Sequence, residues 1–213
     1  MYNIFLLLLH KNQITEKMKK ILFILLVLCT TVCTVNGANP KKTNVRYLKG
    51  AVPMIDGKVV FTLDKDYENC DAQKIYDNVY DILYKMTNEE NQFEQSQITL
   101  VNKNEHIIVA RFKEWMVFQK NAFVYDRAVF NYTVIARCSN NHVNITISHI
   151  NYIYETDDNG EGGYSMPAEE CISDEFALTK NKKKLSKYYG KFRRMTIERK
   201  DEIFNNIHTA ITR

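Results

Sequence analysis

The chain has 213 residues, of which 45% are hydrophobic and 25% charged, and its formal net charge at neutral pH is +4. This length and composition fit one globular domain with accessory segments. Only 7 Gly and 3 Pro stand against 13 Tyr and 11 Phe, which excludes a disordered or linker-dominated chain and favours a sheet-rich domain.

The N-terminal end has the features of a secretory signal peptide, which we assign to residues 1–37. Met18 is followed by two lysines, an apolar run and a small-residue exit before Ala38. The apolar run ahead of Met18 is too short to span a bilayer, so Met18 is the expected true start. The mature chain is therefore expected in the periplasm or outside the cell, without a transmembrane segment. An uncleaved anchor and a lipoprotein attached through Cys29 or Cys33 are the alternatives.

Charge is distributed unevenly along the mature chain. Four lysines and one glutamate leave with the signal peptide, so the formal charge falls from +4 to +1. Residues 180–200 hold ten basic residues and one acidic residue, which leaves the rest of the mature chain at about −8. We expect residues 38–52 to form a leader, 53–178 a single α+β domain, and 179–213 a basic, helical C-terminal segment packed on or extending that domain.

The local patterns predict the elements of this domain. "IDGKVVFTLD" reads as a turn at Asp56 and Gly57 followed by a strand. Residues 71–86 read as a helix, because Asp71 suits the N-cap and the apolar residues after it recur at helical spacing. Four further strands are predicted from alternating or continuous apolar runs at 98–101, 107–118, 123–136 and 143–154. From Asn181 the chain is predicted to be helical to near its end, with a break at Gly190.

The order strand, helix, four strands, helix predicts an α+β fold, with helices packed on one face of a curved antiparallel sheet. The signal peptide, the strand "IDGKVVF", the helix "AQKIYDNVYDIL" and the meander of "IIVARFK", "FNYTVIARC" and "HVNITISHINYIYE" resemble an uncharacterised family of secreted proteins from gut-type Gram-negative bacteria. That family is described as having a TATA-binding-protein-like fold. The resemblance covers residues 53–154; it implies the fold and the compartment, and it transfers no catalytic residue. Likeness of fold to a DNA-binding protein is not evidence of DNA binding.

The basic segment is the first candidate binding surface. Its cations alternate with tyrosine and phenylalanine, a composition suited to contacts with anionic chains. In a secreted protein the partner would be an anionic envelope glycan or lipid, or another envelope protein, and nucleic acid is not expected unless the signal peptide is misassigned. The alternative is a solvated helix whose charge offsets the acidic remainder. The candidate residues are Lys182, Lys183, Lys184, Lys187, Lys191, Arg193 and Arg194.

A second candidate surface lies on the predicted sheet. If helices leave one sheet face uncovered, polar and aromatic residues there could bind a ligand or partner. The competing interpretation is that the single tryptophan, Trp115, belongs to the core. The candidate residues are Arg111, Lys113, Trp115, Tyr125 and Arg127.

No catalytic, phosphate-binding or metal-binding motif occurs, and we expect neither cofactor nor metal. The acidic loop 155–167 partly matches a calcium loop, but Ala168 stands where the bidentate Glu belongs. The sequence therefore favours a secreted, non-enzymatic envelope domain that acts as a binding module. The enzymatic alternative is an envelope hydrolase with a carboxylate site on the sheet, drawn from Glu105, Glu114, Asp126 and Glu155.

Three cysteines remain in the mature chain. In an oxidising compartment we expect a disulfide between Cys138 and Cys171, which leaves Cys70 free. Three buried thiols acting as small apolar residues are the alternative.

Overall fold

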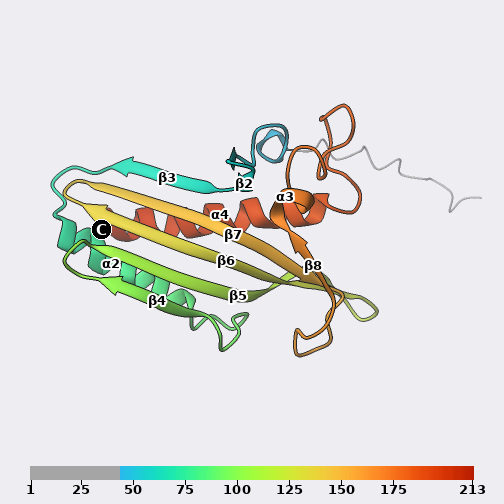
Figure 1. Ribbon diagram of the computed structural model, residues 1–213, viewed down its shortest axis with the longest axis horizontal. Coiled ribbons are helices and arrows are strands. Elements are labelled where there is room, and N and C mark those ends of the chain that lie inside the picture. The colour runs from blue at the N-terminus through green and yellow to red at the C-terminus, as the bar shows by residue number, and fades with distance from the viewer. Residues whose placement is uncertain (1–43) are drawn as a thin grey trace, which may run out of the picture. The chain divides into compact units, whose positions relative to one another are not determined.

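The computed structural model describes residues 44–213, and the predicted signal peptide and the start of the leader lie outside the described residues. One antiparallel sheet forms the body of the molecule (Figure 1), with strand order β3-β7-β6-β5-β4 and with β8 also paired to β7. Its strands are β3 (Phe61–Asp66), β4 (Gln97–Asn102), β5 (Ile107–Lys120), β6 (Tyr125–Ser139), β7 (His142–Tyr154) and β8 (Tyr164–Pro167). The strands predicted from the sequence are all present, and the α+β class is confirmed.

The N-terminal part of the described chain is built from short elements. The 3₁₀ helix η1 (Val45–Tyr47) comes first, followed by the hairpin of β1 (Met54–Ile55) and β2 (Lys58–Val59). Its turn uses Asp56 and Gly57 at φ 50° and 75°, a left-handed conformation that Asp and Gly adopt more readily than most residues. The predicted turn is therefore confirmed.

Two long helices cover one face of the sheet, α2 (Ala72–Met86) and α4 (Gly190–Ile211), and a short helix, α3 (Ala168–Cys171), follows β8 (Figure 1). The predicted cap of α2 is confirmed, because the Lys74 backbone N–H donates to Asp71 Oδ1 at 2.8 Å. No helix within residues 44–213 is long and apolar enough to cross a membrane.

The core lies between the helices and the sheet. Successive strand residues point to opposite faces, so alternate residues meet the helices. The strands contribute Ile108, Phe112, Phe130, Tyr152 and Ile145, and the helices contribute Ile75, Val79, Leu83, Phe192, Ile203 and Ile207, all buried.

No helix of residues 44–213 covers the opposite face of the sheet (Figure 1), and that face is largely polar. Rows of paired residues cross it, such as Arg111, Thr133 and Ser148, and Lys113, Asn131 and Asn151. We call it the open face.

A bulge interrupts β7 on the open face. The register shifts where Asn131 faces Asn151 but Thr133 faces Ser148, and His149 takes a φ of 53°. The apolar alternation changes phase at the same point, from Ile147 to Ile150. The bulge therefore turns His149 toward solvent without moving the apolar residues off the core.

The helix expected from Asn181 begins only at Gly190, so the prediction is wrong for residues 181–189. Lys182 has a φ of 58°, and the Lys184 backbone N–H donates to Thr179 Oγ1 at 3.2 Å, which closes a polar turn. Gly190 is the first residue of the helix, and a larger residue would not fit there, because a Cβ would lie 2.6 Å from Leu185 Cβ.

Candidate functional site

A hollow of about 290 Å³ lies on the open face, and we call it the open-face hollow. Neighbouring strands and the segment before β4 build it, and its lining contains no carboxylate. It is lined by Gln95, Gln97, Arg111, Phe112, Lys113, Asn131, Tyr132, Thr133 and His149.

Two cations of the open-face hollow have no acidic partner. Within residues 44–213, neither Arg111 nor Lys113 forms an ion pair, and the Lys113 ammonium lies 4.6 Å from the centre of the Phe93 ring. The Ser148 hydroxyl lies 3.0 Å from His149 Nδ1. The hollow thus combines unpaired positive charge with amide and hydroxyl groups, an arrangement suited to carboxylate or phosphate oxygens.

The other three residues predicted for the sheet face contact one another and lie outside the open-face hollow, and Tyr125 and Arg127 line a separate hollow at the end of β7. The Arg127 guanidinium lies 3.7 Å from the Trp115 ring centre and 4.4 Å from that of Tyr125, and it pairs with Asp158 at 2.7 Å. Trp115 packs on Phe93, with ring centroids 4.9 Å apart. Of the five candidates, Arg111 and Lys113 therefore line the hollow, while Trp115, Tyr125 and Arg127 form a stack beside it.

Arg193 is a structural residue, although the sequence placed it on an exposed basic surface. It is fully buried and donates to the carbonyls of Tyr47, Leu48 and Ile172 at 2.6–2.7 Å, and to Asp174 Oδ1 at 2.6 Å. These bonds fasten the segment around η1 to α4. The prediction that Arg193 contacts an anionic partner is therefore wrong.

Lys191 is also engaged within the protein. Its ammonium donates to Asp126 at 2.7 Å and to the Tyr154 hydroxyl at 2.7 Å, and it lies 4.6 Å from the Phe118 ring centre. Burial lowers the pKa of Lys191, but the bonds to Asp126 and Tyr154 outweigh it, so the net pKa is raised. Lys191 is therefore a partly buried anchor and not a free cation.

The other candidates of the basic segment are one residue that is bonded within the protein and four that are exposed. The Lys182 ammonium donates to the Asp174 carbonyl, which ties it to the loop after α3. The remaining candidates are exposed, and they are Lys183, Lys184, Lys187 and Arg194.

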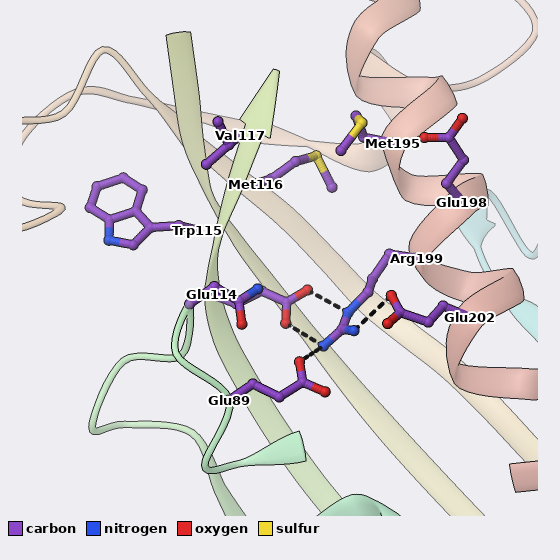
Figure 2. A pocket seen from close by; sticks show the side chains of 10 residues that line it. Glu89, Glu114, Trp115, Met116, Val117, Met195, Glu198, Arg199 and Glu202 are labelled. Atoms are coloured by element: carbon purple, nitrogen blue, oxygen red, sulfur yellow. Dashed lines mark hydrogen bonds and ion pairs between the residues drawn. The ribbon is translucent and has the colours of Figure 1, made fainter. Parts of the chain in front are cut away.

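A second hollow, of about 420 Å³, lies on the helix side between β5, α4 and the segment after α2. Figure 2 shows Arg199 at its centre, facing three carboxylates. Its Nη2 donates to Glu89 at 2.5 Å and its Nη1 to Glu202 at 2.9 Å. Trp115 points to the other side of β5 (Figure 2), so this hollow and the open face are separated by the sheet.

Glu114 is the buried member of this group, with 3% of its surface exposed. Arg199 Nε donates to its Oε1 at 3.0 Å and Nη2 to its Oε2 at 2.9 Å, and the Gln92 amide also donates to Oε2. Burial raises the pKa of Glu114, and Arg199 opposes that shift. Both carboxylate oxygens are therefore occupied.

The four carboxylates considered for a hydrolase do not form one group. Glu105 accepts from Asn102 in the turn before β5, Glu114 lies on the helix side, and Asp126 binds Lys191. Only Asp126 and Glu155 line the same hollow, at the end of β7. Within residues 44–213 no group of three or more His, Cys, Asp or Glu side chains is placed to hold a metal ion.

The predicted disulfide is not formed, and Cys138 and Cys171 are separate buried thiols. Cys138 faces Val143 at the start of β7, whereas Cys171 lies near Tyr152 toward the other end of that strand. Burial raises the pKa of each of the two thiols to about 12.

Sequence reasoning missed Arg199, Gln92 and His149. Arg199 and Gln92 carry no local signal, because their partner Glu114 is 85 and 22 residues away. His149 did have a local signal in the sequence. The alternation of apolar residues along the strand skips a residue between Ile147 and Ile150, and such a skip marks a bulge.

The helix-backed antiparallel sheet with an open face places this chain in the class of α+β domains with a TATA-binding-protein-like fold. It belongs to the family described as "Domain of unknown function (DUF4468) with TBP-like fold", which matches residues 61–153. The family and fold expected from the sequence are thereby confirmed.

The solved structures that are similar to the chain include two from gut-type bacterial genera. A DUF4468 family protein from Bacteroides ovatus is 32% identical with a TM-score of 0.72, covering 80% of this chain and 96% of that one. A TBP-like protein from Parabacteroides distasonis is 22% identical with a TM-score of 0.60, covering 76% of this chain and 97% of that one, and shows the fold alone. No curated protein matches the chain.

Proposed function

We propose that the protein is a secreted, non-enzymatic domain of the cell envelope that binds an anionic component through the open-face hollow. The observation that supports this most directly is that Arg111 and Lys113 line the same hollow, and that no carboxylate lines it. Guanidinium and ammonium groups that lack a partner in the protein gain most from an incoming carboxylate or phosphate. Neighbouring amide N–H and hydroxyl groups can donate to that anion.

The arrangement on the helix side favours a binding module over a hydrolase. A catalytic carboxylate needs an oxygen free to take a proton or attack a substrate. Arg199 and Gln92 occupy both oxygens of Glu114, the most buried carboxylate in the described chain. This network ties α4 to β5 and suits a structural role.

The binding proposal is tested with mature protein, residues 38–213. Its affinity for polygalacturonate, inorganic phosphate and duplex DNA is measured by calorimetry at several salt concentrations. The double variant Arg111→Gln and Lys113→Gln removes two charge-assisted bonds and should weaken anion binding roughly tenfold or more. The matched control, Lys183→Gln and Lys184→Gln, removes the same charge from the exposed basic segment and should leave affinity nearly unchanged.

Equal affinity of the sheet variant and the wild type would overturn the proposal. A larger loss of affinity in the control variant would place the binding site on the basic segment. Preference for duplex DNA with steep salt dependence would favour the nucleic-acid alternative. Sustained release of reducing ends from polygalacturonate, abolished by substituting a carboxylate of the hollow at the end of β7, would favour the hydrolase.

Secretion is tested separately, by the intact mass of the protein in fractions of its native host. A chain beginning at Ala38 outside the cytosol is expected. A chain that keeps Met18 in the cytosol would contradict secretion, and an added lipid mass at Cys29 or Cys33 would establish the lipoprotein alternative.

A further inference from the structure

The hairpin that joins β5 and β6 extends beyond the rest of the sheet. Residues 117–120 of β5 pair only with residues 125–127 of β6, since β7 joins β6 only at Ala128. We call residues 117–127 the arm. Figure 1 shows it leaving the sheet beyond β7 at the right of the view.

The end of the arm carries the most exposed aromatic side chain of the described chain. Phe123 is 97% exposed, and its neighbours Val124 and Tyr125 are 44% and 47% exposed. We call these three residues the tip. Apolar side chains gathered at the end of a projecting hairpin form a contact surface and not a part of the core.

Several backbone N–H groups of the tip and its turn are hydrogen-bonded within the turn. The N–H groups of Phe123 and Val124 donate to Asn121 Oδ1 at 3.0 and 2.8 Å, and the Asn121 N–H donates to the Val124 carbonyl at 2.9 Å. These three N–H groups need no hydrogen bond from water, which lowers the cost of moving the tip into an apolar environment.

The base of the arm is held firmly by the body of the protein. Phe118 packs on Phe192 of α4 with ring centroids 4.6 Å apart, and Asp126 pairs with Lys191 at 2.7 Å. The arm therefore presents its tip in a fixed direction, and little ordering is needed when the tip makes a contact.

We propose that the tip inserts into the interface of a phospholipid bilayer. The tip has only three apolar side chains, far fewer than the roughly 20–30 residues a side that a standard protein interface uses, and such a small apolar area suits weak, reversible insertion at the headgroup boundary. Lys120 is exposed beside the tip, with its ammonium 5.2 Å from the Tyr125 ring centre, and can reach lipid phosphates while the ring lies at headgroup level. This proposal is independent of anion binding in the open-face hollow.

Vesicle partition of residues 38–213 tests the proposal directly. The vesicles are phosphatidylethanolamine with phosphatidylglycerol at a ratio of three to one, and phosphatidylcholine alone. Replacing Phe123 and Val124 by Ser should lower the partition coefficient roughly ten- to hundredfold. This is the effect expected from losing the burial of one large apolar side chain.

The matched control replaces Leu100 and Val101 of β4 by Ser. These residues are 48% and 50% exposed, and they pair with β5 near Val109, at the end of the strand opposite to the arm. Partition of this variant should equal that of the wild type. The variant Phe123→Trp should also show a blue-shifted emission on vesicle addition, beyond any change in the wild type, whose one tryptophan is Trp115.

Several outcomes would overturn the proposal. One is partition of the Ser tip variant that equals that of the wild type, and another is absence of vesicle binding by the wild type. Binding that depends on Lys183, Lys184 and Lys187 but not on the tip would show purely electrostatic adsorption. A wild-type dimer that dissociates in the tip variant, without vesicle binding, would instead assign the tip to a second copy of the chain.

Discussion

Arg199 of α4 donates two parallel hydrogen bonds to Glu114 of β5, one of 3.0 Å from Nε and one of 2.9 Å from Nη2. Glu114 is almost fully buried, while the other partners of Arg199, Glu89 and Glu202, lie nearer the surface. The pair fastens the last helix to β5, the strand next to the edge strand β4. Removing one member of such a pair leaves the other buried without its counter-charge.

Glu114→Gln should lower the free energy of unfolding by about 1–3 kcal/mol, because the amide nitrogen of Gln cannot accept a hydrogen bond, so one of the two Arg199 N–H groups that donate to Glu114 loses its buried acceptor. The matched control is Glu202→Gln, which makes the same chemical change at a carboxylate that is half exposed and should cost less than about 1 kcal/mol. Urea denaturation of both variants measures the difference. If the two variants lose the same free energy of unfolding, burial of Glu114 does not strengthen its contribution.

The pH dependence of stability offers a second test of Glu114. Burial raises its pKa in the folded protein, so the folded state binds this proton more tightly than the unfolded chain does. Its contribution is therefore fully present below the ordinary glutamate pKa and is lost as the pH rises through the folded pKa. The free energy of unfolding of the wild type minus that of Glu114→Gln should fall as the pH is raised from about 4 to 7. A difference that stays constant or rises would contradict the raised pKa.

Arg193 and Arg194 are adjacent in the sequence but have opposite environments. Arg193→Lys should cost about 3 kcal/mol, because an ammonium cannot replace the planar fork that reaches three carbonyls and Asp174. Arg194→Lys, on the exposed side, should be nearly neutral.

Hydrogen exchange locates the effect of Arg193→Lys. The Leu48 and Ala51 amides, which donate to Val45 and Leu48 carbonyls, should exchange faster, since Arg193 fastens that segment to α4. Unchanged exchange there would contradict the anchoring role.

The sequence predicted those parts of the fold that depend on local patterns. The cap at Asp71 and the spacing of Ile75, Val79 and Leu83 specify α2 within one stretch of chain. Alternation specifies β5, β6 and β7, and hairpins join neighbouring strands. The α+β class follows from these elements and their order.

The site was harder to predict because it depends on contacts between distant segments. Arg193 bonds to Leu48 across 145 residues, and no local pattern announces that contact. A run of basic residues reports charge but not burial, so Arg193 and Lys191 were grouped with exposed lysines. One signal was available: Arg193 precedes Ile197 by one helical turn, which places it on the buried side of α4.

The last prediction concerns the cysteines. It distinguishes the three free thiols of the structure from the disulfide that the sequence led us to expect. Cys138 and Cys171 are buried thiols with pKa values raised to about 12, whereas Cys70 is half-buried. Because the thiolate is the reactive form, a thiol reagent should modify Cys70 first in native protein, and all three thiols only after unfolding in urea. The measurement uses residues 38–213 without reductant. Fewer than three reactive thiols in urea, with a mass increase of two hydrogens on reduction, would instead establish a disulfide in the mature chain.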